Sequence, residues 1–436
     1  MPRRASSLIF IALLLGSFAL GWRVQILSAA AEDKEQDKES AYRNFELFTS
    51  VMEIIRKDYV DGSKLSYQDL TYSALKGMLS GLDPHSQFME PSNYEEMKQE
   101  TGGQFGGIGV VVGMKDGVLT IISPMEDTPG FKAGLLPNDK IIRIEGKSTE
   151  RLSLGDAVKQ LRGMPSTKVT ITILRPSTRE VKDVVIVRAM IKVESVKDAK
   201  VMDGGIGYVR IVQFNEPTAD EFEKALQKIE KDGLVGLVLD LRNNPGGLLE
   251  SAVDVAGKFL PKDQLVVFTE GRNPAAKQEY RVRSSKPHPD YPLVVLINEG
   301  SASGAEIVAG ALQDTKRAVL VGETSFGKGS VQSVIPVKGN CAIRLTTAKY
   351  YTPSRKVIHE HGITPDILVP MSDEDWSQIL IQRSQAADPA NKEAPKAEEF
   401  LPDGTRKLPA RDLQLDRAVD LIKGINAFKN RVGREK

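Results

Sequence analysis

The sequence is poor in cysteine: Cys341 is the only one among 436 residues, so no disulfide bond can form within the chain. The fold must therefore be stabilised by its hydrophobic core, even in an oxidising compartment. A content of 41% hydrophobic residues is sufficient to fill ordinary globular cores. Cys341 lies in the apolar, strand-like segment CAIRLTTAKYY, where we expect it to pack as a small hydrophobic side chain.

An excess of charge of either sign is also absent. Lysine and arginine together number 59, and aspartate and glutamate 58, which gives a formal net charge of +1. Without a long-range electrostatic field, nucleic acid is not expected as a partner. Histidine is scarce, with four residues, and no identifiable cluster of carboxylates or cysteines accompanies His359 and His361. We therefore expect neither a metal site nor a cofactor.

Long hydrophobic runs are missing, apart from one near the N-terminus. The run from Leu8 to Trp22 follows Arg3 and Arg4, and it is short compared with the ~20 residues of a membrane span. We interpret residues 1–31 as an export signal, with an uncleaved anchor as the alternative. No cysteine lies near this segment, which excludes a lipid-modified N-terminus. The expected location is the bacterial periplasm or the outer face of the inner membrane.

The rest of the sequence divides into four parts. Residues 32–100 carry helical apolar spacing, and residues 101–190 contain short β-branched runs with one helix near 154–162. Residues 191–371 alternate strand and helix patterns, and residues 372–436 hold a polar linker and a last amphipathic helix. We expect a helical N-terminal region, a β-rich domain, an α/β core and a C-terminal helix, in this order.

The β-rich part contains GGIGVVV followed by AGLLPNDKIIRIEG, which together resemble a PDZ domain, a peptide-binding module. The resemblance implies that the loop Gly107-Ile108-Gly109-Val110 binds a peptide carboxylate. Gly107 and Gly109 allow successive backbone N–H groups to converge on an anion, and the strand that follows has an edge to which an extended peptide can add. The alternative is a glycine-rich hairpin without a binding role.

The α/β part alternates apolar strands and amphipathic helices. Strand LVGLVLDL precedes loop RNNPGG and helix LLESAVDVAGKFL, and strand PLVVLIN precedes loop EGSAS and helix GAEIVAGALQDT. This order predicts right-handed crossovers around a mainly parallel sheet, with functional loops at the C-terminal ends of the strands. The helix ADEFEKALQKIEKDG comes before these segments, and Thr218 and Glu221 form a capping-box pattern at its start. Three glycine-bearing loops are candidates for chemistry: 242–247, 299–306 and 325–330.

Gly322, Gly327 and Lys328 have the spacing of a phosphate-binding loop. That motif requires Ser or Thr directly after the lysine to bind magnesium, and Gly329 occupies this position. The segment that follows, GSVQSVIPV, has strand character, whereas a phosphate-binding loop precedes a helix. These departures disfavour a nucleotide hydrolase, as does an export signal that directs the chain away from cytosolic ATP.

The loop EGSASGAE places Ser301 and Ser303 directly before a helix, whose N-terminal N–H groups favour developing negative charge. Ser303 and Glu306 also match a capping box, and spacing alone favours that structural role. A serine nucleophile needs a base, which lysine can supply when burial keeps it neutral. Lys328, between two glycines 25 positions later, is a candidate. None of the four histidines is excluded as a base: His85, His288, His359 and His361.

Several segments, taken in order, resemble the C-terminal processing peptidases, also called tail-specific proteases: LDPHS, the PDZ-like module, DLRNNPGG, NEGSASGAEI, GETSFGKGSVQ and YYTPSRKVIHEHGITPD. The likeness covers roughly residues 40–370. It implies a multidomain α/β fold with a helical N-terminal section, a β-rich PDZ domain and a protease core. The core sheet is expected to be mainly parallel and of the crotonase/ClpP-like type.

The same resemblance implies roles for individual residues. Ser303 is the implied nucleophile, Lys328 the general base and Gln332 the group that orients the lysine. These assignments predict an exported serine endopeptidase whose PDZ domain captures protein C-termini and presents them for cleavage nearby. Its expected partners are protein or peptide substrates with free C-termini. An adaptor protein and a second copy of the chain, in a homo-oligomer, are two further partners that the sequence leaves open. The alternative is a PDZ scaffold with an inactive protease-like domain, against which the presence of all three residues argues.

The implied oxyanion hole consists of backbone N–H groups from Gly304 and from one glycine of NPGG, for which Gly246 is preferred over Gly247. Relatives often have another small residue in place of Gly304, and glycine keeps the N–H donor. Arg162, in the segment LRG, matches a PDZ arginine that couples peptide binding to an aligned active site in some relatives. We therefore assign it a regulatory role.

Overall fold

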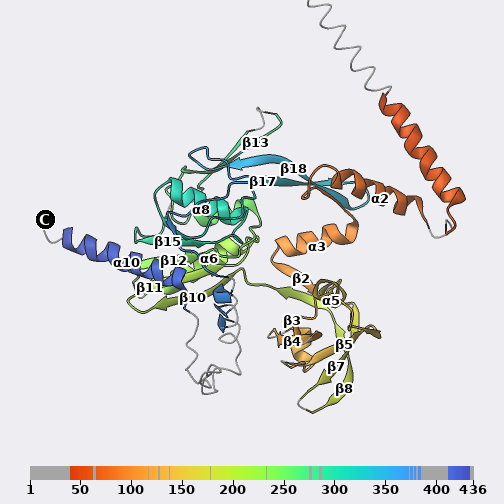
Figure 1. Cartoon of the computed structure of the whole chain (residues 1–436), viewed down its shortest axis with the longest axis horizontal. Coiled ribbons are helices and arrows are strands. Elements are labelled where there is room, and N and C mark those ends of the chain that lie inside the picture. The colour runs from red at the N-terminus through yellow and green to blue at the C-terminus, as the bar shows by residue number, and fades with distance from the viewer. Residues whose placement is uncertain are drawn as a thin grey trace, which may run out of the picture. The chain divides into compact units, whose positions relative to one another are not determined.

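The computed structural model of the chain is shown in Figure 1. It describes residues 40–61 and 65–372, with gaps at 116, 126–127, 137, 177, 232, 274–276 and 284–286, and then residues 374–376, 378–379, 382–383 and 411–432. The chain divides into two compact units, Met1–Pro84 and His85–Lys436. The predicted export signal lies outside the described residues. Within the described ranges, no helix has both the length and the apolar character needed to cross a membrane.

The first unit contains two helices in its described part, at residues 40–58 and in α2 (Tyr67–Ser80). Ser66 caps α2, because its Oγ accepts the Asp69 N–H at 3.0 Å while the Asp69 carboxylate accepts the Ser66 N–H at 3.0 Å. This reciprocal capping box satisfies backbone donors that a helix start otherwise leaves unpaired. The helical pattern read from the apolar spacing is thus present in this unit.

The second unit begins with β1 (Gln87–Met89) and α3 (Pro91–Thr101), and a β-rich module follows. The elements of this module are β2 (Gln104–Gly107), β3 (Val110–Lys115), β4 (Val118–Pro124), α4 (Pro129–Lys132), β5 (Lys140–Ile144), β6 (Lys147–Ser148), α5 (Leu154–Leu161), β7 (Lys168–Arg175), β8 (Glu180–Val187) and β9 (Ala189–Lys192). The sheet order β3-β4-β5-β7-β8 leaves β3 at an edge, and α5 packs beside it. The short helix α4 was not predicted from the sequence.

The α/β core is built on a six-stranded sheet with the order β10-β11-β12-β15-β16-β19. Its elements are β10 (Val196–Met202), β11 (Ile206–Ile211), α6 (Thr218–Glu230), β12 (Gly236–Asp240), α7 (Leu249–Ala256), β15 (Leu293–Ile297), α8 (Gly304–Asp314), β16 (Val319–Gly322) and β19 (Ile367–Leu368). The strand β10 runs antiparallel to β11, and the other neighbours pair in parallel. The loops after β12 and β15 therefore meet at one edge of the sheet.

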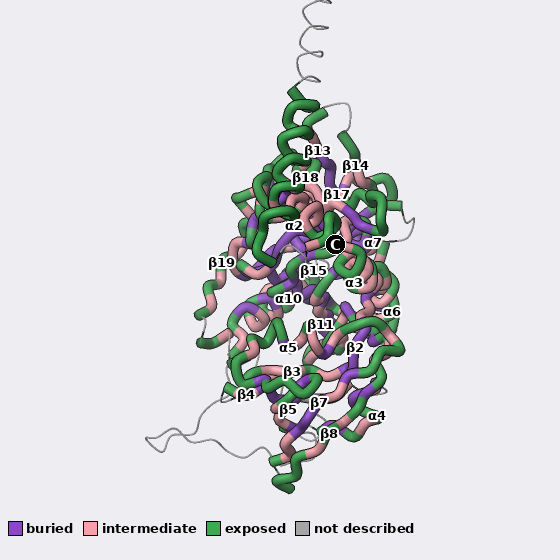
Figure 2. Tube along the Cα trace, turned by 90° about the vertical axis from the view of Figure 1, so that its right-hand side faces the viewer, coloured by how far each residue is buried: buried purple, intermediate pink, exposed green. Residues whose placement is uncertain are grey.

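Both faces of this sheet are covered by helices. Alternate side chains of each strand point to opposite faces, so each strand contributes to two buried clusters. One face packs against α6, α7 and α8 and includes Leu239, Val295 and Leu320. The other face packs against α10 (Leu413–Val432), where Ala418 and Ile422 contribute. The strand β15 is buried along its whole length, as Figure 2 shows by its colour. The C-terminal helix therefore completes the core of the sheet.

A second sheet has the order β1-β18-β13-β14, and β17 pairs with β18 as well. Its remaining strands are β13 (Leu265–Gly271), β14 (Gln278–Arg281), β17 (Ser330–Val337) and β18 (Cys341–Tyr351). Cys341 is buried and forms no disulfide, in line with the packing role expected for it. This sheet carries the end of the Lys328 loop and the residue pair Tyr350 and Tyr351.

The predicted capping box of α6 is wrong. The N-cap is Pro217, and Glu221 instead accepts hydrogen bonds from the N–H of Ser195 at 2.9 Å and from its Oγ at 2.6 Å. Thr218 is already the first helical residue, and its hydroxyl donates to Ser195 Oγ at 2.8 Å. Ser195, 23 positions before Thr218, thus forms hydrogen bonds with both polar side chains of the motif. Local spacing in the sequence could not reveal this contact.

A buried ion pair network joins α10 to the loop after β12. The guanidinium of Arg242 is fully buried between two carboxylates, 2.7 Å from Asp240 Oδ2 and 2.8 Å from Asp412 Oδ1. Burial is the largest single influence on Asp240 and would raise its pKa, but the charge and hydrogen bonds of Arg242, together with Arg383 and the Tyr208 hydroxyl, hold that pKa well below its usual range. Because Arg242 begins the loop 242–247, the C-terminal segment supports the loop that carries the NPGG glycines.

We expect Asp412→Asn to lower the free energy of unfolding of the second unit by about 2–3 kcal/mol. Breaking a buried ion pair costs ~3–5 kcal/mol, and Asp240 still compensates part of the Arg242 charge. The matched control is Asp416→Asn, inside α10, where the partner Arg411 is exposed and the expected loss is at most ~1 kcal/mol. Denaturant titration measures both. Equal losses in the two variants would contradict a supporting role for Asp412.

Candidate active site

Ser303 lies on a sharp turn between β15 and α8. Its backbone has φ 53° and ψ −111°, a conformation that is strained for a residue other than glycine. Ser303 is 7% exposed, and its Oγ lies 2.9 Å from Tyr350 Oη. Strain of this kind is kept only when surrounding contacts enforce it, and it is concentrated at functional sites.

Glu306, in the first turn of α8, connects the Ser303 turn to the Lys328 loop. Its Oε2 accepts the backbone N–H of Ser303 at 2.8 Å and that of Lys328 at 2.9 Å. Its Oε1 accepts the Ser325 hydroxyl at 2.6 Å and the Gly327 N–H at 2.7 Å. Burial raises the pKa of this fully buried carboxyl, and the four hydrogen bonds oppose that rise. The capping-box prediction thus identified only one of four contacts that Glu306 makes.

Lys328 occupies the loop between β16 and β17 and is half-buried. Burial lowers the pKa of its amine, and the positive charge of Arg344 lowers it further. Both effects favour the neutral amine, which is the form that can accept a proton. The flanking glycines allow close packing: a Cβ on Gly329 would lie 2.3 Å from the backbone N of His359, and one on Gly327 would also meet this turn. The glycines are therefore explained by a close backbone approach.

Gln332, predicted to orient the lysine, lies on β17. Its Nε2 donates to Ser330 Oγ at 2.9 Å and lies 3.5 Å from Thr346 Oγ1. Among the described residues, the Lys328 amine makes no hydrogen bond with Ser303 Oγ or with Gln332. The structure therefore brings the loops of Ser303 and Lys328 together through Glu306.

The glycines of the NPGG loop face the Ser303 turn. A Cβ on Gly246 would lie 2.6 Å from Ser303 Cβ and 2.7 Å from the Gly304 N, so only glycine fits there. The N–H of Gly246 donates to Asn244 Oδ1 at 2.8 Å. In the described part of the chain, the N–H groups of Gly247 and Gly304 have no acceptor. A Cβ on Gly304 would lie 3.5 Å from the Gly247 N, so these two donors are close together.

Tyr350 was missed by sequence reasoning. Its ring is 4% exposed, its hydroxyl contacts Ser303 Oγ, and its backbone N–H donates to Gly329 O at 2.8 Å. Burial raises the pKa of the phenol to about 12. In the sequence it stands beside an identical residue, Tyr351, and no pattern separates the two.

The predicted carboxylate-binding loop connects β2 to β3. Gly107 ends β2 and Val110 begins β3, which is the edge strand beside α5. Ile108 points into the core of the β-rich module, where it is 2% exposed. Its carbonyl accepts the Gly130 N–H at 2.6 Å. The loop is therefore anchored at the end of an open strand edge.

Gly109 adopts φ +72°, which favours glycine. A Cβ at this position would lie 2.3 Å from Thr128 Cβ. The carbonyl of Gly109 accepts the Thr128 hydroxyl and the Met125 N–H, each at 2.9 Å. Any side chain here would both strain the backbone and displace Thr128.

Arg162 follows the last turn of α5 and contacts α3. Its Nη1 lies 2.6 Å from Glu100 Oε1 and 3.5 Å from Glu96 Oε1, and its guanidinium lies over the Phe105 ring at 4.8 Å. The helix α3 in turn packs against β18, the strand that ends with Tyr350 and Tyr351. Arg162 therefore has no direct contact with the Ser303 site among the described residues.

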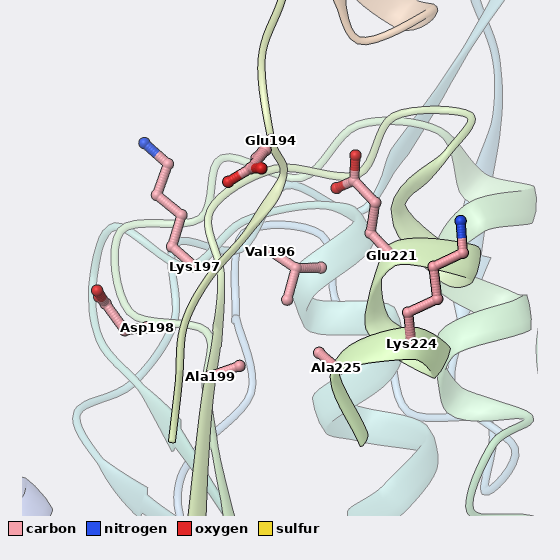
Figure 3. A pocket seen from close by; sticks show the side chains of 8 residues that line it. All are labelled: Glu194, Val196, Lys197, Asp198, Ala199, Glu221, Lys224 and Ala225. Carbon is pink, nitrogen blue, oxygen red and sulfur yellow. The ribbon is translucent and has the colours of Figure 1, made fainter. Parts of the chain in front are cut away.

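A separate groove lies between β10 and α6, as seen in Figure 3. It is lined by charged and small apolar side chains, namely Glu194, Val196, Lys197, Asp198, Ala199, Glu221, Lys224 and Ala225. None of the predicted site residues lines this groove. Glu221, one of its acidic residues, is engaged by Ser195. The groove is thus distinct from the candidate active site.

Comparison with known proteins agrees with the motifs. Residues 205–369 match the model of peptidase family S41, and residues 120–175 match a PDZ domain. A carboxy-terminal-processing protease of Bartonella bacilliformis is 40% identical over 89% of this chain and 90% of the relative. The carboxy-terminal processing protease CtpB of Bacillus subtilis is 38% identical over 79% of this chain and 71% of the relative.

A solved structure described as the photosystem II D1 C-terminal processing protease is 28% identical, with a TM-score of 0.45, over 74% of this chain and 86% of that chain. The sequence relatives cover most of both chains at identities well above 30%, and they confirm the family predicted from the motifs. The chain belongs to peptidase family S41 and is a serine peptidase that carries a PDZ domain.

Proposed function

We propose that the protein is an exported endopeptidase that cleaves proteins near their C-termini, with Ser303 as nucleophile and Lys328 as general base. The main support for this proposal is the Glu306 carboxylate, which accepts the backbone N–H groups of both residues at 2.8 and 2.9 Å. Two loops that are distant in sequence are thereby held by one buried group. The relatives are named for carboxy-terminal processing, which supports the substrate class.

The proposed reaction begins when the neutral amine of Lys328 takes the proton of Ser303 Oγ as this oxygen attacks the peptide carbonyl. The lowered pKa of Lys328 supports this role. Gln332 is proposed to orient the amine when substrate is bound. The lysine then passes the proton to the leaving amine, and water releases the acyl group from Ser303.

The oxyanion is proposed to bind to the N–H groups of Gly304 and Gly247. We choose Gly247 in place of Gly246, because the Gly246 N–H already donates to Asn244 Oδ1 at 2.8 Å. One donor belongs to the first residue of α8 and the other to the adjacent NPGG loop, and this pair suits a developing negative charge. The core sheet with its helices is proposed to be of the crotonase/ClpP-like type, as the family resemblance implies.

The β-rich module is proposed to capture the substrate's C-terminus. The loop from Gly107 to Val110 would bind the terminal carboxylate, and the open edge of β3 beside α5 would pair with the extended chain. Arg162 is proposed to couple this binding to the active site through its ion pair with Glu100 on α3, which packs against β18. Export is proposed from the sequence of residues 1–31. An adaptor protein or a homo-oligomer is also proposed, and it would act on the coupling between the β-rich module and the active site.

We expect a peptide with a free C-terminal carboxylate to be cleaved about 10- to 100-fold more efficiently, in kcat/KM, than its amidated twin. Hydrogen bonds to a charged group contribute ~1.5–3 kcal/mol, which corresponds to this range. Gly109→Ala is expected to abolish the difference, because its Cβ would collide with Thr128.

The matched control for this test is Gly117→Ala. Gly117 also has φ +72°, but a Cβ there meets nothing within 4 Å, so the variant carries the backbone strain without the collision. It should keep the preference for the carboxylate. If the wild type cuts the carboxylate and the amide equally well, recognition of C-termini by this module is wrong.

A further inference from the structure

The hydroxyl of Tyr350 contacts the proposed nucleophile directly. Its Oη lies 2.9 Å from Ser303 Oγ, and the residue is 4% exposed. The Tyr350 N–H donates to Gly329 O at 2.8 Å, which ties the ring to the loop that carries Lys328. Tyr350 belongs to the hydrophobic core cluster of the α/β core, so its ring is held by packing as well. The phenol therefore has a fixed position beside the reacting oxygen.

We propose that Tyr350 is a catalytic residue that donates a hydrogen bond to Ser303 Oγ and stabilises the negative charge on this oxygen while it attacks the substrate. The inference rests on the proposed function of Ser303 and Lys328, and it adds a third side chain that acts on the nucleophile. In the resting state either hydroxyl can donate to the other. Once Ser303 has lost its proton, only the phenol can donate.

The proton balance of this step is closed. Ser303 Oγ gives its proton to the neutral amine of Lys328, its oxygen forms a bond to the carbonyl carbon, and the carbonyl π electrons move to the carbonyl oxygen. The phenol keeps its own proton throughout. When the carbon–nitrogen bond breaks, Lys328 protonates the leaving amine, and Oγ becomes a neutral ester oxygen. Burial raises the pKa of Tyr350 to about 12, which agrees with a phenol that stays protonated near neutral pH.

A different role for the same contact is a latch that holds Ser303 away from Lys328 until substrate binds. One observation favours the donor role. Glu306 already fixes the backbones of Ser303 and Lys328, so the turn keeps its position without the Tyr350 contact. The two roles predict effects of opposite sign.

The test is Tyr350→Phe, with Tyr351→Phe as the matched control. Tyr351 stacks on Phe268 with ring centroids 5.1 Å apart, and among the described residues it is the Tyr350 hydroxyl, not that of Tyr351, that contacts Ser303 Oγ. We expect Tyr350→Phe to lower kcat by roughly 10- to 100-fold with little change in KM, as for the loss of one hydrogen bond to a developing charge. Tyr351→Phe should stay within about twofold of the wild type. Thermal unfolding of each variant checks that the fold is retained.

Three outcomes are decisive when Ser303→Ala is assayed beside these variants. A fall in kcat for Tyr350→Phe alone supports the donor role. An unchanged or increased kcat overturns it, and an increase identifies the contact as a latch. If Ser303→Ala keeps its activity, the proposed nucleophile itself is wrong, which distinguishes a failure of the proposed function from a failure of the role of Tyr350.

Discussion

Lys328→Arg is expected to lose nearly all peptide cleavage, by roughly 1000-fold in kcat, while the protein stays folded. A general base contributes ~10²–10⁴-fold to a reaction, and arginine cannot act as one because its guanidinium stays protonated at any working pH. The positive charge is kept, so a loss of activity reports on proton transfer. The measurement is the cleavage rate of a peptide with a free C-terminus, with circular dichroism as the check of folding.

The matched control is Lys338→Arg, which makes the same change at an exposed turn between β17 and β18. It should leave the rate unchanged. A phosphate site would behave differently, since arginine also binds phosphate well, and Lys328→Arg would then keep some affinity. Near wild-type cleavage by Lys328→Arg would exclude this lysine as the base and direct attention to the histidines.

Glu306→Gln is expected to lower kcat by about 100-fold and to destabilise the second unit. Each carboxylate oxygen accepts two hydrogen bonds, so an amide of the same size must turn its NH₂ group toward two donors. Two buried donors then lose their acceptor, at a cost of ~1–3 kcal/mol each. The backbones of Ser303 and Lys328 would lose their common anchor, and a displacement of about 1 Å in an active site can cost 10²-fold in rate.

Glu299→Gln serves as the control, since Glu299 is exposed in the loop that leads to Ser303. It should change neither the rate nor the melting temperature. The rate of peptide cleavage and the thermal unfolding of both variants are compared under identical conditions. If Glu306→Gln keeps both the wild-type rate and the wild-type melting temperature, the four hydrogen bonds do not organise the site as proposed.

The order of elements in the α/β core was readable from the sequence, because each strand and helix there has a clear local pattern. β12, β15 and β16 are continuous apolar runs, and α6 to α8 show helical spacing between them. The strand β1 was not predicted, since it is three residues long and its partner, β18, lies more than 250 positions away. Its existence depends on tertiary pairing that local pattern does not contain.

The roles of Ser303 and Lys328 stay predictions. The sequence singled out these two residues because small residues and glycines surround them in motifs of the family, and the structure shows that one carboxylate binds the backbones of both. From the sequence, Glu306 was predicted only to cap the helix after Ser303. Three of its four hydrogen bonds reach the distant loop at residues 325–328, and local spacing does not predict these. Tyr350 could not be chosen over Tyr351 without the fold, since one points to Ser303 and its neighbour stacks on Phe268. Local sequence patterns do not predict contacts between loops that are distant in the chain.

In the proposed mechanism, Ser303 attacks the peptide bond and neutral Lys328 takes its proton. The most direct measurement is the rate of peptide cleavage by the wild type between about pH 6 and 10, with Ser303→Ala alongside. The neutral amine becomes more abundant as pH rises through its pKa, and burial and Arg344 lower that pKa. We expect a rate that rises with pH, with a midpoint below the ~10.4 of a free lysine, and no cleavage by Ser303→Ala. A midpoint near the ~6.5 of histidine that persists in Lys328→Arg, or activity in Ser303→Ala, would contradict it.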